Sequence, residues 1–163
     1  MEDRVLHRRQ EQAWKKLHDF TEQRLNHAPS VALGSAEAML MTRKRANKPS
    51  TGLPHPSGLL EQAEQWTSTL DAWHLVALHS ICMQAKSFLV AMALLEAHGT
   101  ADCPFDKNME KALEASRVEE EFQIAIWGLV EGGHDYDRLN CSVQLHSAQL
   151  MTKMIAMDNN LLS

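Results

Sequence analysis

The sequence predicts an all-α protein, a helical bundle of about five helices with a long crossing segment rich in proline and glycine after the first helix. Ala, Leu, Glu, Gln and Met, which favour helices, dominate the chain. Apolar residues recur at helical spacings, and the alternation typical of strands is not found. Four of the five prolines fall between residues 28 and 58. We therefore expect a single helical domain over 1–163, with a first helix over 1–27, a linker over 28–58 and the bundle over 59–158.

The first helix is expected from about Asp3 to Asn26, and a short helix follows the linker from about Leu59 to Thr67. One face of the first helix carries residues at helical spacing, which predicts that this face packs on a neighbour. They are Leu6, Ala13, Leu17, Phe20 and Arg24, with Trp14 beside them.

A long helix is expected from Ala72 to about His98. Asp71 or Thr69 is suited to accept the first free backbone N–H groups, and Gly99 is suited to end the helix. Apolar residues cover most of its circumference, which is typical of the central helix of a bundle. They are Trp73, Leu75, Val76, Leu78, Ile81, Cys82, Ala85, Phe88, Leu89, Met92 and Leu95.

The next helix is expected from about Lys107 to Glu131, ended by Gly132 and Gly133. At about 100° per residue it has two opposite apolar faces, as if sandwiched between layers. One face has Met109, Leu113, Ile124 and Trp127, and the other has Val118, Phe122, Ala125 and Leu129.

Glu120 lies in the middle of the first of these apolar faces. Burying an unpaired carboxylate costs several kcal/mol. We therefore expect Glu120 to be paired, protonated or reserved for a partner protein, and Lys86 and Arg117 are the candidates for an internal polar pair. Glu114 and Glu121 lie on one edge of the helix and Glu119 on the other.

The last helix is expected to run to about Met157, with Asp135 as its N-cap. Its packed side is predicted from the apolar residues at helical spacing. These are Leu139, Val143, Leu145, His146, Leu150, Met154 and Met157.

Composition excludes several functions. A formal net charge of -5 argues against nucleic-acid binding, which needs a basic face. Three cysteines, an odd number without a CxxC pair, argue against a disulfide framework. The chain has no apolar run of about 18 residues, so it is not expected to be an integral membrane protein.

Motifs for catalysis or cofactor binding are also missing. The chain has neither a phosphate-binding glycine loop nor a GxSxG nucleophile elbow. His134, Asp135 and Asp137 can hold a divalent cation in principle, but the same residues make an ordinary helix start. The neighbouring carboxylates Glu119–Glu121 point about 100° apart, so they cannot converge on one substrate. We expect no catalytic site, no metal and no cofactor.

Several motifs resemble one family in the same order along the chain. They lie at 70–75, 85–90, 94–96 and 115–124, and the last reads Ala-Ser-Arg-Val-Glu-Glu-Glu-Phe-Gln-Ile. Trp127-Gly128, Glu131 and His134-Asp135 follow at matching spacing. The family is that of the alpha-subunit chaperone of the F-type ATP synthase, also called ATP synthase assembly factor 2, and the resemblance covers about residues 5–150.

The resemblance implies a chaperone of the mitochondrial matrix, free or attached to the inner-membrane ATP synthase, that is not an enzyme. Its expected partner is the unassembled alpha subunit, whose interface it shields, with other ATP synthase subunits as further candidates. The residues expected to contact the partner are Glu114, Glu119, Glu121, Trp127, Glu131, His134 and Asp135. The alternative for the three consecutive glutamates is that they only solvate or stabilise their helix.

One departure from the family bears on function. Family members carry a smaller β-rich domain before the helical domain, and this sequence starts after the point where that domain ends. The sequence is then either a fragment of a longer protein or a chain that keeps only the helical part. The departure also leaves open a second function, in which the chain is a permanent structural subunit of a mitochondrial ATP synthase that derives from the chaperone.

Overall fold

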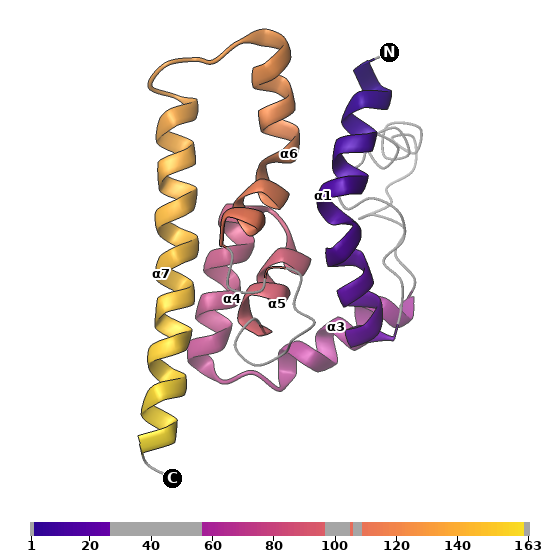
Figure 1. The fold of residues 1–163 in the computed structure, drawn as a ribbon. Helices are drawn as coiled ribbons and strands as arrows, with labels where there is room; N and C mark the ends of the chain where they lie inside the picture. Colours follow the sequence, from indigo (N-terminus) through magenta and orange to yellow (C-terminus); the bar gives the residue numbers. More distant parts are fainter. Residues whose placement is uncertain (1, 27–56, 97–104, 106–108, 162–163) are drawn as a thin grey trace, which may run out of the picture. The chain divides into compact units, whose positions relative to one another are not determined.

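The computed structural model describes residues 2–26, 57–96, 105 and 109–161 (Figure 1). These residues form six α-helices and no strand, which confirms the all-α class. The linker predicted over 28–58 and the helix end predicted at Gly99 lie almost entirely outside the described residues. The helices fall into two compact units, Met1–Ser68 and Thr69–Ser163, and the expectation of a single domain stays a prediction.

The first unit holds α1 (Glu2–Leu25) and α3 (Ser57–Ser68), which contact each other. Leu17 and Phe20 of the predicted stripe are buried on α1, and Leu25 is buried with them. Arg24 was predicted on the same stripe but is exposed. Thr21 is buried with them, and its Oγ1 donates to the carbonyl oxygen of Leu17 at 2.7 Å, so burial leaves the hydroxyl satisfied. Asn26 follows the helix with a positive φ of 53°, the left-handed conformation in which helices commonly end.

The second unit holds α4 (Ala72–Ala85), α5 (Phe88–Glu96), α6 (Met109–Trp127) and α7 (His134–Leu161). Helix α4 packs most extensively on α7 and α5, and α6 packs on all three. Every residue from Leu89 to Leu95 is buried, so α5 is the apolar centre of this unit. Asp71 caps α4, because its Oδ1 accepts from the backbone N–H groups of Trp73 and His74 at 2.9 Å.

The single helix predicted from Ala72 to His98 is wrong, because the chain breaks at Lys86 and Ser87. Lys86 ends α4 in the left-handed conformation, with φ 52° and ψ 28°. Ser87 starts α5, where its Oγ accepts from the N–H of Val90 at 3.3 Å. The chain changes direction at this break, so only the second segment, α5, lies at the centre of the unit. Helix α4 keeps an exposed apolar face with Trp73, Leu75, Val76 and Met83.

Helix α6 ends at Trp127, earlier than predicted. Gly128 adopts a φ of +91°, which side chains rarely allow, and its N–H still donates to the carbonyl of Ile124 at 2.9 Å. The two apolar faces are buried only up to Phe122. Met109, Val118 and Phe122 are buried, whereas Ala125 and Trp127 are exposed.

The packed side predicted for α7 is wrong except for Leu145. The buried residues of this helix are Cys141, Leu145, Ala148, Gln149 and Thr152. The remaining residues predicted to pack are exposed, namely Leu139, Val143, His146, Leu150, Met154 and Met157. Asp135 also lies inside the first turn of α7 and is not its N-cap, because Gly133 precedes the helix and accepts from Asp137 N–H.

None of the described helices is both long and apolar enough to cross a membrane.

Candidate functional site

An ionic network joins α6 to α7. Arg117 Nη2 donates to Glu120 Oε1 at 2.7 Å, and Arg117 Nε lies 3.4 Å from Glu121 Oε1. From α7, Arg138 Nε donates to the same Glu121 oxygen at 2.9 Å, and its Nη2 donates to Glu121 Oε2. This second contact makes the Arg138–Glu121 pair bidentate, the geometry in which a guanidinium binds a carboxylate best. Asp135 adds a longer contact of 3.9 Å to Arg138.

Glu121 is the centre of this network, and its ionisation responds to both arginines. The hydrogen bond from Arg138 is the largest cause that lowers the pKa of Glu121, and the hydrogen bond and charge of Arg117 lower that pKa further. The carboxylate is therefore held in its charged form. Only 8% of the surface of Arg117 is exposed, so its buried charge has to be compensated by these two glutamates.

The structure brings together some of the residues predicted to form a site and separates others. Glu120 meets Arg117 one turn earlier on its own helix, whereas Lys86 makes no ion pair within the described residues. Glu121, expected to face a partner protein, binds arginines of its own chain. Sequence reasoning missed Arg138, because no local spacing links it to a residue 17 positions earlier.

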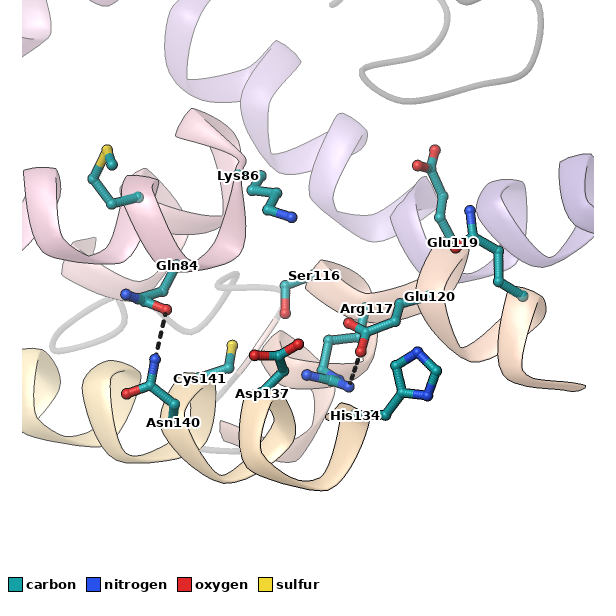
Figure 2. A pocket seen from close by; sticks show the side chains of 12 residues that line it. Gln84, Lys86, Ser116, Arg117, Glu119, Glu120, His134, Asp137, Asn140 and Cys141 are labelled. Atoms are coloured by element: carbon teal, nitrogen blue, oxygen red, sulfur yellow. Dashed lines mark hydrogen bonds and ion pairs between the residues drawn. The ribbon is translucent and has the colours of Figure 1, made fainter. Parts of the chain in front are cut away.

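A polar cavity of about 460 Å³ lies beside this network (Figure 2). Its lining comes from the end of α4, the middle of α6 and the start of α7, and includes Gln84, Lys86, Ser116, Glu119, His134, Asp137, Asn140 and Cys141. At the side of the cavity where α7 packs on α4, Asn140 Nδ2 donates to Gln84 Oε1 at 3.5 Å.

Burial raises the pKa of the Cys141 thiol, so the thiolate that acts as a nucleophile is scarce at neutral pH. Within the described parts of the chain, no three His, Cys, Asp or Glu side chains come together as a group that can hold a metal ion.

The connection between α6 and α7 forms an exposed apolar corner, defined by Ile126, Trp127, Leu129 and Val130. Trp127 is 77% exposed, the most of any large hydrophobic residue that the structure describes. Hydrogen bonds hold the corner in place. His134 Nδ1 accepts from Val130 N–H at 3.0 Å, and His134 N–H donates to the Val130 carbonyl at 3.2 Å. Gly132, with a φ of +79°, supplies the turn.

Polar residues border the apolar corner. Glu131 and Asp135 are exposed beside it, and His134 is half-buried at the start of α7. Glu114 is exposed two turns or more before the corner on α6, and Glu119 is half-buried and lines the polar cavity. An exposed apolar patch with a polar rim is typical of a surface that binds another protein. The described geometry thus favours recognition of a protein over chemistry.

No family model matches the chain. A Schizosaccharomyces pombe protein named "Protein atp12, mitochondrial" is 27% identical over 95 residues, which cover 58% of this chain and 30% of the relative. The Saccharomyces cerevisiae "Protein ATP12, mitochondrial" is 31% identical over 91 residues, which cover 54% of this chain and 28% of the relative. The chain thus spans under a third of the length of these curated relatives.

The fold also has a match among solved structures. The crystal structure of Atp12 from Paracoccus denitrificans superposes with a TM-score of 0.68 over 92% of this chain and 54% of that chain, at 19% sequence identity. At this identity the match shows a shared helical fold. Together with the two sequence matches it confirms the family resemblance drawn from the motifs.

Proposed function

The chain is related to the Atp12 proteins in sequence and in fold, and we propose that it is an ATP synthase assembly factor that binds the free alpha subunit and shields its subunit interface. The observation that carries the proposal is the sequence match to two Atp12 proteins over more than half of this chain. Both relatives have mitochondrial names, which supports a mitochondrial site of action, and we place the chain in the matrix. No catalytic step is assigned to it.

The apolar corner is the surface that we assign to the alpha subunit. A chaperone must offer apolar area that the client covers, while its rim keeps the free protein soluble. Trp127 is suited to anchor the contact, because large aromatic side chains contribute most to interface energy. Glu131, His134 and Asp135 supply the polar rim next to it.

The acidic residues divide into two groups under this proposal. Glu121 joins α6 to α7 through Arg138, and Glu120 pairs with Arg117 within α6, so both are assigned to shaping the surface and not to contacting the client. Glu114 is exposed and Glu119 is half-buried at the polar cavity, and both are assigned to basic residues of the client. Charge contacts of this kind raise the rate of association more than the affinity.

The test is a titration of purified alpha subunit with the chain and two matched variants. Trp127→Ala removes the anchor of the apolar corner, and Trp73→Ala removes a tryptophan of similar exposure (61%) on α4, away from the corner. We expect the parent and Trp73→Ala to bind alike, and Trp127→Ala to bind about 30-fold more weakly, since a central aromatic contributes about 2 kcal/mol or more. Equal affinity of all three proteins refutes the apolar corner as the binding surface. No binding by the parent refutes the alpha subunit as the client.

A further inference from the structure

Helix α7 carries a second exposed apolar surface, separate from the corner. Six large side chains, each more than half exposed, follow one side of the helix over almost its whole length. We call them the α7 stripe: Tyr136, Leu139, Val143, Leu150, Met154 and Met157. His146 and Ser147, both exposed, lie between the two halves of the stripe. At about 100° per residue these eight positions occupy a sector roughly 100° wide, centred nearly opposite the buried Leu145.

The order of these positions is the same read in either direction. From Tyr136 to Met157 the successive spacings are three, four, three, one, three, four and three residues. The pattern is therefore symmetric about the midpoint between His146 and Ser147, near the middle of the 28-residue helix. A partner that runs antiparallel and has the same sequence meets the stripe with matching positions throughout. A two-fold interface requires this self-complementarity.

An antiparallel pair about this midpoint has specific contacts. Tyr136 of one copy lies opposite Met157 of the other, Leu139 opposite Met154, and Val143 opposite Leu150. The small Ser147 falls near the axis opposite His146, where it allows the two helices to approach closely. Spacings of three and four residues are those of helices that pack along a common seam.

Charge also favours the antiparallel direction. His146 and Lys153 are the only side chains between Leu139 and Met157 that can carry a positive charge, and there is no carboxylate in that interval. A parallel pair in register brings the two Lys153 ammonium groups side by side. An antiparallel pair instead places each Lys153 opposite Asn140 of the other copy, about 20 Å along the axis from the other lysine at 1.5 Å per residue.

We propose that α7 is the interface of a two-fold homodimer, in which the α7 stripes of two copies pack antiparallel about the midpoint of His146 and Ser147. The available area fits, because six side chains of this size and exposure offer on the order of 700 Å² per copy, near the roughly 800 Å² per partner of a stable interface. The dimer does not depend on the proposed function, since the apolar corner is not part of the α7 stripe.

Sedimentation equilibrium of the whole chain tests whether the dimer forms. We expect a mass twice the 18.4 kDa of one chain. Leu150→Glu should raise the dissociation constant of the dimer about tenfold or more, since one buried charge in each half of the seam costs over 1.4 kcal/mol. Val76→Glu, at a residue of matched exposure on α4, should leave it unchanged. Circular dichroism confirms that both variants are folded.

A charge pair tests the direction and register. In an antiparallel dimer, position 143 of one copy meets position 150 of the other. The double variant Val143→Glu with Leu150→Lys therefore places opposite charges together twice and should remain dimeric. The double variant Val143→Glu with Leu150→Glu places like charges together and should be monomeric.

Three results overturn the proposal. One is a parent that is monomeric at all concentrations. Another is a dimer that Leu150→Glu and Val76→Glu affect equally. The third is a monomeric parent whose binding to the alpha subunit is lost in Leu150→Glu but kept in Trp127→Ala, which assigns the α7 stripe to the client. That last result overturns both the dimer and the assignment of the alpha subunit to the apolar corner, whereas the first two results leave that assignment untouched.

Discussion

At the scale of residues, the run Glu119–Glu121 shows how neighbouring identical side chains acquire different roles. Successive helical positions point about 100° apart, so each carboxylate meets a different environment. Glu120 meets Arg117 within its own helix, a partner that helical spacing alone can suggest. Glu121 meets Arg138, which only the packing of α7 on α6 brings into reach, and no spacing in the sequence indicates that pair.

This difference predicts how Glu121→Gln changes stability with pH. The pKa of Glu121 in the folded chain lies below the ordinary value of 4.5, so the ionised carboxylate stabilises the fold above that value. The stabilisation is lost as pH falls through the lowered pKa. We expect Glu121→Gln to reduce the free energy of unfolding at neutral pH by about 0.5–1 kcal/mol, discounted for a side chain 42% exposed.

Urea denaturation at neutral and acidic pH measures this effect. The difference between parent and Glu121→Gln should vanish below the folded pKa, where the parent carboxyl is itself neutral. Glu114→Gln is the matched control, because this exposed glutamate of the same helix has no ion pair within the described residues. If Glu114→Gln and Glu121→Gln destabilise the chain equally at neutral pH, the α6–α7 ion pair contributes nothing.

At the scale of elements, two deviations from the expected helices have a common cause, which is that periodicity reports apolar faces but not what covers them. Residues 72–96 have the sequence pattern of one continuous apolar helix, yet Lys86 takes a left-handed conformation. A lysine in the sequence does not indicate such a conformation, because it is typical of glycine and asparagine. On α7 the small residues Cys141 and Ala148 are buried and the larger stripe is exposed. These small side chains allow α4 and α7 to approach each other closely, which explains why the face of α7 that carries them is the packed one.

The left-handed Lys86 predicts a stabilising substitution. Glycine adopts positive φ without the steric cost that a Cβ imposes, so Lys86→Gly should raise the free energy of unfolding by about 1 kcal/mol. His79→Gly, at an exposed interior position of α4, should lower it by about 0.5–1 kcal/mol because the residue is helical there. Thermal melting distinguishes the two. A destabilised Lys86→Gly contradicts the break and favours the continuous helix.

At the scale of the whole molecule, the sequence predicted the class of fold, the helix bounds to within a few residues at most ends, and the resemblance to the Atp12 proteins. The Ser-Arg-Val-Glu-Glu-Glu-Phe-Gln-Ile motif and the residues after it sufficed to indicate this resemblance, because their order and spacing are specific. The residues predicted to contact a partner protein stay a prediction. Trp127 and Glu131 are exposed at the corner, but the corner itself exists because α6 ends at Gly128, four residues before the predicted glycines. Gly128 is itself a local stop signal, and the prediction placed the end of the helix at the later pair of glycines instead.

The most direct test of the central claim, that the chain accompanies the unassembled alpha subunit, is native electrophoresis of mitochondrial matrix and membrane extracts that contain the tagged chain. The account predicts that the chain migrates with free alpha subunit in a complex that lacks the other ATP synthase subunits, and that this complex increases when assembly of the catalytic head is blocked. Migration of the chain with the complete ATP synthase, in amounts equal to its resident subunits, would contradict the account and identify a permanent structural subunit.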